Sequence, residues 1–434
     1  MRLAKTLDPT RPVEDNSPCL YDHVTTDLNS WHFYLNDYAA AKEHLRHVVD
    51  STRPGSGFNT VPGRVQAREP LLNSEYGGIS ARMGDRDVSW CFHFLTNELR
   101  RHEKVCGYVY TELQDIEWER NGLLNYDRTP KELGYDPRDV NRADFLALDT
   151  PPCRTAQPGE QISIPAYASH FGAFVGDHAT LVFRLELTDA LGRTVELSQS
   201  PGRRVSFPRF AVTPIGPIQF TLPKRPGLVA LRAWLQATSG EVLARNWTYC
   251  HVVGDEEPAG VLRLPLGDVA GEAMAAFEVD GKQEAAWIEG AGVLSADVRL
   301  PAALSADDIT AVSFLAELSS CRPGGGGKQT DHDRWPSQVE VLVGDLLLGR
   351  VDLPDQPADG RGVLSHHYGF AGRYGQLVQL AAHRESLREV ATVLEQGARV
   401  VLRVPGDLPG GLCVYLGRTG RYPVEPCVLI ERHC

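Results

Sequence analysis

The feature that most constrains this chain is a change of pattern near residue 138. Before it, short apolar segments that end in polar or aromatic residues alternate with segments whose apolar residues recur every three or four positions. The first pattern predicts buried strands and the second predicts amphipathic helices, and their alternation is typical of a parallel sheet. After residue 138, Pro and Gly divide the chain into short alternating runs, which predicts β-sandwiches.

Residues 1–137 are expected to contain four strands and two helices. The strands are predicted around 11–16, 27–34, 70–76 and 105–112. The first helix should begin at Asn36 or Asp37 and end at Pro54-Gly55, and the second should run from about Asp87 to Glu103. Because an α/β barrel needs eight strands and typically about 250 residues, this region can form only part of a (β/α)8 TIM barrel.

The rest of the chain is predicted to form two all-β sandwich domains. Residues 138–253 contain strand runs at 161–167, 179–187 and 227–235, a spacing that favours an immunoglobulin-like sandwich. Residues 254–434 begin with a linker and are expected to form a second sandwich of the jelly-roll kind, with carbohydrate binding as a candidate role. One amphipathic helix is predicted there, with Gly397 at its end.

Composition excludes several functional classes. The net charge of −12 and the scattered Lys and Arg residues argue against a nucleic-acid partner, and no apolar run approaches the ~20 residues of a membrane span. No secretory signal follows Met1, and the localisation is left open. None of the nine cysteines forms a CxxC pair, so we expect buried, reduced thiols, no metal site and no cofactor.

The run of residues 72–78, Leu-Asn-Ser-Glu-Tyr-Gly-Gly, resembles the segment around the catalytic nucleophile of glycoside hydrolase family 2, which includes β-galactosidases and β-glucuronidases. Segments 7–13, 27–34 and 107–119 resemble, in order, the fifth, sixth and eighth barrel strands of that family. The resemblance implies that residues 1–137 are about strands 5–8 of a TIM barrel. It covers the C-terminal portion of the family's architecture.

By this resemblance Glu75 is the nucleophile of a retaining, β-galactosidase-like O-glycoside hydrolase that acts through a glycosyl-enzyme intermediate. The family's general acid/base lies in an Asn-Glu pair that would precede Met1. Here the one Asn-Glu pair, Asn97-Glu98, falls inside the second predicted helix, where we expect Glu98 to be a solvated residue. The acid/base is therefore expected to be missing from this chain, which should have little activity alone.

Further site residues follow from the same resemblance. Asn29 and Trp31 would line the sugar subsite, and Tyr110 would lie under the sugar ring. His32 is a second candidate for substrate binding, but period two points Trp31 and His32 to opposite sides, so about half of this cluster should be core. Glu112 opens an acidic stretch that either binds sugar hydroxyls or forms a solvated rim with ion pairs.

The rival hypothesis is a non-catalytic carbohydrate-binding or scaffold fragment. A half barrel leaves unpaired strand edges, which predicts association with the missing N-terminal barrel half or self-association. In the last domain, a loop at residues 329–335 combines carboxylates with a Trp, so sugar contact, calcium coordination and a plain surface loop all stay open.

Overall fold

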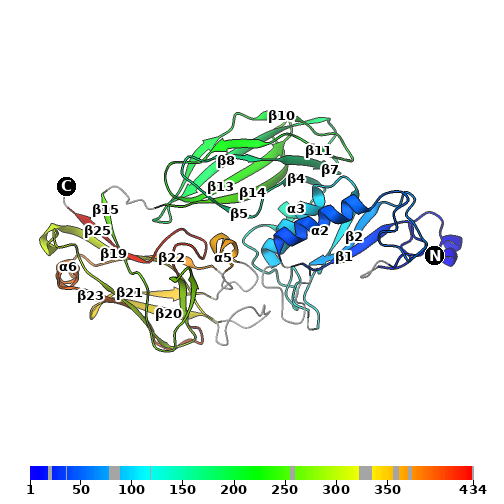
Figure 1. Cartoon of the computed structure of the whole chain (residues 1–434). Coiled ribbons are helices and arrows are strands. Elements are labelled where there is room, and N and C mark those ends of the chain that lie inside the picture. Colours follow the sequence, from blue (N-terminus) through cyan, green and yellow to red (C-terminus); the bar gives the residue numbers. More distant parts are fainter. Residues whose placement is uncertain are drawn as a thin grey trace.

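The computed structural model describes residues 1–17, 22–35, 37–77, 88–117, 119–254, 260–321, 335–354, 361–369 and 374–432. Strands dominate it, as expected for a chain rich in β-sandwich structure. Its elements fall into three successive groups, which Figure 1 shows as a blue-to-cyan part, a green part and a yellow-to-red part. The division of the chain into domains at residues 137 and 253 stays a prediction.

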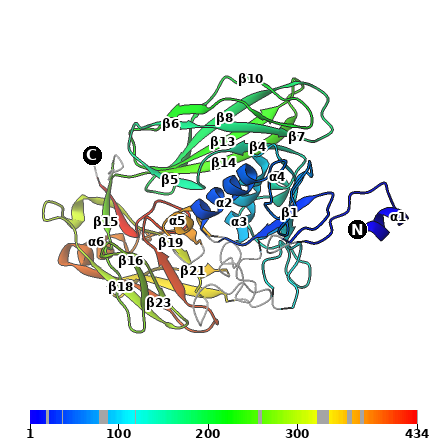
Figure 2. The ribbon, with the colours of Figure 1, turned by 45° about the vertical axis from the view of Figure 1, so that its right-hand side comes forward.

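The first group contains a three-stranded parallel sheet with the order β1-β2-β3. Its elements are α1 (Arg2–Leu7), β1 (Asn29–Phe33), α2 (Tyr38–Ser51), β2 (Leu71–Gly77), α3 (Val88–Arg100) and β3 (Val105–Thr111). The βαβαβ order is the predicted one, whereas closure into a barrel is not seen among the described residues. In Figure 2 helix α1 lies away from the rest of the molecule.

The strand predicted at residues 11–16 is wrong. In this segment carboxylates take the place of a neighbouring strand as hydrogen-bond partners. Asp27 accepts a hydrogen bond from the Val13 backbone N–H (2.7 Å), and Asp15 accepts from the backbone N–H groups of Val24 and Thr25 (both 2.8 Å). The segment is therefore a loop held by hydrogen bonds between carboxylates and backbone N–H groups that are distant in the chain.

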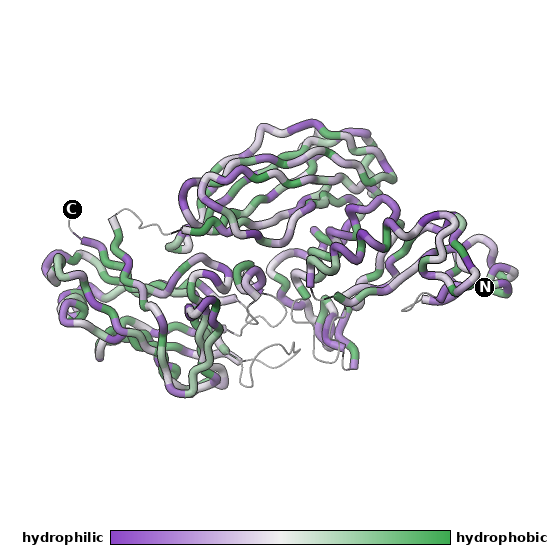
Figure 3. Tube along the Cα trace, in the orientation of Figure 1, coloured by the Kyte–Doolittle hydropathy of each residue, from purple (hydrophilic) through white to green (hydrophobic). Residues whose placement is uncertain are grey.

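Helix α2 forms where its cap and its apolar residues predicted it. The Asp37 carboxylate accepts a hydrogen bond from the Ala40 backbone N–H (2.7 Å), which satisfies one free donor of the first turn. Ala41, Leu45 and Val48 lie on one face and are fully buried. Figure 3 shows hydrophilic positions along the rest of this helix, so α2 covers the sheet with one face only.

Helix α3 is buried on all sides, contrary to the expectation that Glu98 is solvated. The helix contacts β2 and β3 on one side and β4 on the other. Glu98 has no exposed surface, burial raises its pKa, and it pairs with Arg101 (2.7 Å). Asn97 bonds both backbone groups of Leu148, each at 2.8 Å, and thereby fastens the helix to the middle part.

The middle group is a β-sandwich around one hydrophobic core. One sheet has the order β10-β8-β13-β14-β5 with β9 on β8, and it faces the short sheets β11-β7-β4 and β12-β6. The elements are α4 (Pro137–Val140), β4 (Asp144–Leu148), β5 (Cys153–Ala156), β6 (Gln161–Ile164), β7 (Ala166–His170), β8 (His178–Thr188), β9 (Thr194–Gln199), β10 (Arg203–Ser206), β11 (Ala211–Pro214), β12 (Ile218–Thr221), β13 (Gly227–Gln236) and β14 (Val242–Val252). The single strand predicted at 161–167 is two strands in different sheets, because Pro165 interrupts the ladder.

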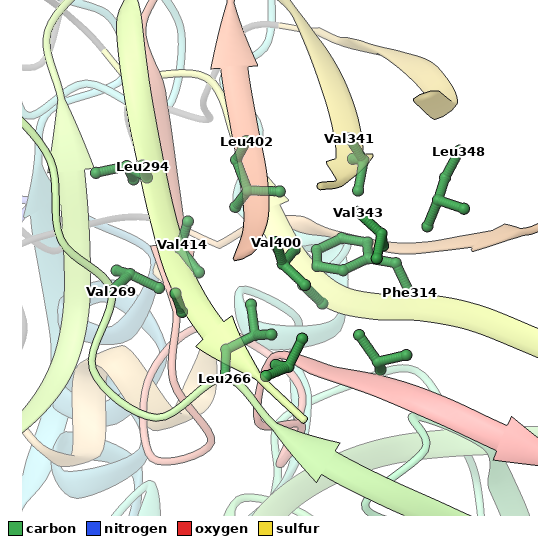
Figure 4. Close-up of a cluster of buried hydrophobic side chains, with 14 of the residues drawn as sticks. Leu266, Val269, Leu294, Phe314, Val341, Val343, Leu348, Val400, Leu402 and Val414 are labelled. Atoms are coloured by element: carbon green, nitrogen blue, oxygen red, sulfur yellow. The ribbon is translucent and has the colours of Figure 1, made fainter. Parts of the chain in front are cut away.

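The last group is a second two-sheet structure, with the orders β15-β25-β19-β24-β17-β16 (β22 on β19) and β18-β23-β20-β21. Its elements are β15 (Val261–Pro265), β16 (Ala275–Val279), β17 (Lys282–Ile288), β18 (Gly292–Val298), η1 (Ala306–Asp308), β19 (Ile309–Ser319), β20 (Ser337–Val343), β21 (Leu346–Leu353), α5 (Val363–His367), β22 (Gln376–Ala381), α6 (Leu387–Gln396), β23 (Ala398–Val404), β24 (Leu412–Tyr415) and β25 (Cys427–Arg432). Figure 4 shows its core, where Phe314 packs among Val341, Val343 and Val400. The predicted helix is α6, and Gly397 caps it with φ 93°.

Six of the seven described cysteines are buried, as expected. Within the described ranges, no helix has the length and apolar character to cross a membrane.

Candidate active site

The candidate site lies toward the carboxyl ends of β1 and β2. In a parallel sheet these ends meet at one edge, so side chains that follow different strands are brought together there. His32 of β1 lies opposite Glu75 of β2, after an irregularity that shifts the register by one residue next to Trp31. A one-residue shift turns side chains toward the other face, and here it places His32 and Glu75 on the same side.

Glu75 is a partly exposed carboxylate held by a tyrosine. Its side chain keeps 33% of its surface accessible. The Tyr34 hydroxyl donates a hydrogen bond to its Oε1 atom, and His32 Nδ1 lies 3.7 Å from Oε2. Both oxygens therefore have a polar neighbour, while one third of the group stays open to a ligand.

A second layer of contacts fixes His32. Its Nε2 atom lies 2.7 Å from the Ser17 hydroxyl, and its Nδ1 atom lies 3.3 Å from the Tyr34 hydroxyl. The Ser17 hydroxyl in turn donates to the Ser74 hydroxyl at 3.3 Å. The loop before β1 thus reaches over the sheet and ties Ser17, His32, Tyr34 and the Ser74-Glu75 pair into one polar network.

Trp31 and Tyr110 do not lie on the face that carries Glu75, so the expectation that they line one subsite with it fails in this structure. Trp31 is 3% exposed and belongs to the core between the sheet and the helices. Tyr110 packs edge-on against Phe92 of α3, with ring centroids 4.9 Å apart, and against Tyr76 at 5.4 Å. The alternation of the strands turns both rings toward the helices.

Asn29 lies at the opposite end of β1. It pairs in register with Leu71, the first residue of β2, whereas Glu75 is four residues further along that strand. The Asn29 side chain is buried and fully engaged, donating to Gln66 (2.8 Å) and accepting from Asn59 (2.9 Å). The structure therefore uses Asn29 to hold the loop before β2 and does not bring it to Glu75.

Glu112 follows directly after β3 and is the most perturbed carboxyl group near the site. Burial raises its pKa to about 7, and the negative charges of Glu119, Asp115 and Glu75 act in the same direction. Its Oε1 atom is buried without a hydrogen-bond partner among the described residues. A carboxyl group in this state is partly protonated near neutral pH and can donate as well as accept a hydrogen bond.

The acidic stretch after Glu112 is not a uniform solvated rim. Asp115 is buried and forms an ion pair with the buried Lys131 (2.9 Å), and it accepts a hydrogen bond from the Gly122 backbone N–H. The Asn121 amide donates to the Thr111 carbonyl at 2.6 Å. These contacts fold the segment after β3 back onto the end of that strand and explain why Glu112 is held in place.

Tyr34 and Ser17 are the functional candidates whose roles the sequence prediction missed. Period two along β1 places Tyr34 on the same side as His32, so the signal for Tyr34 was present. No local pattern pointed to Ser17, which approaches from 15 residues upstream of His32.

In the described part of the chain no group of three or more His, Cys, Asp or Glu residues could hold a metal ion. Most of the loop at 329–335, a candidate for sugar contact or calcium coordination, lies outside the described residues.

No family model and no curated protein matches the sequence. Among solved structures, a β-glucuronidase of Parabacteroides merdae aligns with 100% of this chain at 11% identity and a TM-score of 0.27. An exo-chitosanase of Amycolatopsis orientalis aligns with 76% at 11% identity (TM-score 0.23), and a tandem carbohydrate-binding pair of Paenibacillus barcinonensis aligns with 64% at 10% identity (TM-score 0.22).

This chain covers 45% of the β-glucuronidase, 34% of the exo-chitosanase and 80% of the tandem pair. It thus spans less than half the length of either glycosidase.

Proposed function

We propose that this chain is part of a retaining O-glycoside hydrolase, related to family 2, in which Glu75 is the nucleophile. The observation that carries the proposal is the setting of Glu75: a one-third exposed carboxylate toward the carboxyl edge of a parallel sheet, bonded by the Tyr34 hydroxyl and flanked by His32. Active sites of α/β folds gather at this edge. The resemblance of residues 72–78 to the family's nucleophile segment supports the same residue.

In the proposed reaction a Glu75 carboxylate oxygen attacks the anomeric carbon while the bond to the leaving oxygen breaks. Water then cleaves the glycosyl-enzyme ester and regenerates the carboxylate. The hydrogen bond from Tyr34 orients the carboxylate in the free protein. His32, held by Ser17, supports Tyr34 from behind.

The leaving oxygen must also receive a proton. We propose that the general acid/base is a carboxyl group outside these 434 residues, and that Glu112 binds a sugar hydroxyl. Glu112 suits that role because its raised pKa leaves it partly protonated at neutral pH. General acid catalysis is typically worth 10²–10⁴-fold, so the chain alone should hydrolyse unactivated glycosides very slowly.

The sheet also offers a place for the missing partner. β1 and β3 are the edge strands of the described sheet, and exposed apolar side chains lie near them, including Val109 at the β3 edge. Edges of this kind pair readily with another strand. We propose that a polypeptide carrying the other barrel strands, or a second copy of this chain, covers them.

A non-catalytic carbohydrate-binding or scaffold fragment is the second candidate, and one observation counts against catalysis at Glu75. Trp31 and Tyr110 are packed against the helices, so the face with Glu75 lacks the two aromatic rings expected to support a sugar. An active site without such a platform would bind its substrate weakly.

The test is covalent trapping on the chain as it exists. A panel of 2-deoxy-2-fluoro glycosyl fluorides (gluco, galacto, manno and glucurono) carries a leaving group that needs no proton. We expect one probe to add a single glycosyl group, mapped by peptide mass spectrometry to Glu75. E75Q should abolish this label, whereas E103Q, which alters an exposed glutamate before β3, should keep it.

Labelling of another residue, or equal labelling of E75Q, would contradict the assignment. If no probe labels the chain, the experiment is repeated with the upstream barrel half co-expressed. Absence of label in that complex would remove the enzyme hypothesis and leave the binding role.

A further inference from the structure

A concave surface lies far from Glu75 in the sequence, on the outer face of the middle β-sandwich. Strands β8, β13 and β14 are adjacent in one sheet, and their register places Trp234 beside Arg245, and Arg232 beside both Arg184 and Trp247. The neighbouring residues Ala233 and Leu235 point into the core. Period two therefore turns the aromatic and charged residues outward together.

Two adjoining cavities follow this face. The first, of about 510 Å³, is lined by the sheet and by residues 134–139. The second, of about 350 Å³, shares Arg232, Trp247 and Tyr249 with the first and reaches Tyr374 and Arg421 of the last part of the chain. The shared lining residues place the two cavities side by side, and together they are called the groove below. Each has the size of a small-molecule site.

Trp234 provides an open aromatic surface in this groove. Its indole N–H donates to Gln236 at 3.1 Å, and no other ring contacts it among the described residues. Trp247, by contrast, is stacked on His93 with centroids 4.2 Å apart, so it forms a fixed floor. Sugar rings present flat C–H surfaces that stack on faces such as that of Trp234.

Arg421 provides a positive charge at the other end of the groove. Its guanidinium lies 3.7 Å from the centroid of the Tyr374 ring, and its charge acts on the buried Glu317 carboxylate. No carboxylate of the described chain forms an ion pair with it, whereas Arg184 and Arg232 both bond Glu186 at 2.7 Å. A planar guanidinium that no carboxylate bonds directly is suited to bind a ligand carboxylate through two parallel hydrogen bonds.

We propose that this groove binds an acidic oligosaccharide, with the carboxylate of one sugar unit at Arg421 and a further unit stacked on Trp234. The paired Arg and Glu residues between them offer donors and acceptors for hydroxyl groups. The net charge of the whole chain is −12, so attraction of an acidic chain to this place depends on the local arginines. The proposal does not depend on catalysis at Glu75.

The test is a calorimetric titration of the full chain with tetragalacturonate, with cellotetraose as the neutral probe and hexaglutamate as an acidic peptide. We expect binding of tetragalacturonate that weakens as NaCl is raised. R421Q should weaken it about tenfold and leave the weaker binding of cellotetraose unchanged. W234A should weaken both sugars, again by about tenfold.

Two variants serve as matched controls. R388Q removes a highly exposed arginine elsewhere, and F210A removes an exposed aromatic ring of the same sandwich. Both should bind tetragalacturonate like the unmodified chain.

The proposal is overturned if tetragalacturonate does not bind, or if R421Q and W234A bind it unchanged. It is also overturned if hexaglutamate binds as tightly, which would indicate a peptide surface. If R421Q does not fold, the proposal is tested by W234A and by the NaCl dependence of tetragalacturonate binding. W234A should fold, because it alters a partly exposed side chain.

Discussion

The face that carries Glu75 and the groove on the middle sandwich use similar sequences in opposite ways. In β1 the run Trp31-His32-Phe33-Tyr34 turns Trp31 and Phe33 into the core and leaves His32 and Tyr34 at Glu75. In β13 the alternation has the other phase, so that Ala233 and Leu235 fill the core and Trp234 faces the groove. An aromatic residue in an alternating strand is thus structural or functional according to which face another layer covers.

The largest expected effect comes from removing the two tryptophans in parallel. W31A should lower the free energy of unfolding by about 3–5 kcal/mol, because a fully packed indole is lost from the core. W234A should change it by less than about 1 kcal/mol. Urea unfolding followed by circular dichroism measures both, and similar losses in the two variants would break the comparison.

Tyr34 sharpens the polar side of the comparison. Y34F removes the hydroxyl that donates to Glu75 but keeps the ring. Because hydrogen bonds to charged groups contribute about 1.5–3 kcal/mol, labelling of Glu75 by the reactive fluorosugar should slow at least about tenfold. Stability should stay within about 0.5 kcal/mol. An unchanged labelling rate would show that Tyr34 does not position the carboxylate.

His93 tests the contact between the first two parts of the molecule. Burial lowers its pKa to about 4, and it bonds Asn246 while stacking on Trp247. In the unfolded chain the pKa of His93 is near 6.5. The neutral, buried ring therefore contributes to the free energy of unfolding above pH 6.5, and this contribution is lost as the pH falls toward 4. From pH 7 to pH 5 the contribution of His93 should fall by about 2 kcal/mol.

The measurement is urea unfolding at both pH values, compared with H93Q, whose amide can still bond Asn246 but does not titrate. The difference in stability between the two proteins should shrink as the pH falls. A constant difference would contradict the assignment.

The smallest expected effect on stability concerns α2, one of the helices that cover Trp31. D37A removes the cap of α2 and should cost about 1 kcal/mol, whereas D37N, which can still accept the same hydrogen bond, should cost less. Thermal unfolding measures this, and a loss equal in both variants would show that the cap does not act through its side-chain oxygen.

Much of the secondary structure could be predicted from the sequence, because short-range signals fix it. Asp37, the spacing of Ala41, Leu45 and Val48, and Gly397 marked the ends and faces of their helices, and strand runs marked β2, β3, β8 and β13. The failures occurred where distant groups decide. Residues 11–16 became a loop because the Asp27 carboxylate bonds the backbone there, and Glu98 became buried because the sandwich covers α3.

The sequence by itself determined the alternation of strands and helices up to residue 138, the β-rich remainder, and Glu75 as the carboxylate to examine. Only the tertiary structure decided which side of each strand is buried, and with it the different fates of Trp31, Tyr110 and Trp234. The physical reason is that a strand presents two faces with equal local geometry. The layer that packs against one of them comes from residues far away in the chain, and no local pattern encodes that choice.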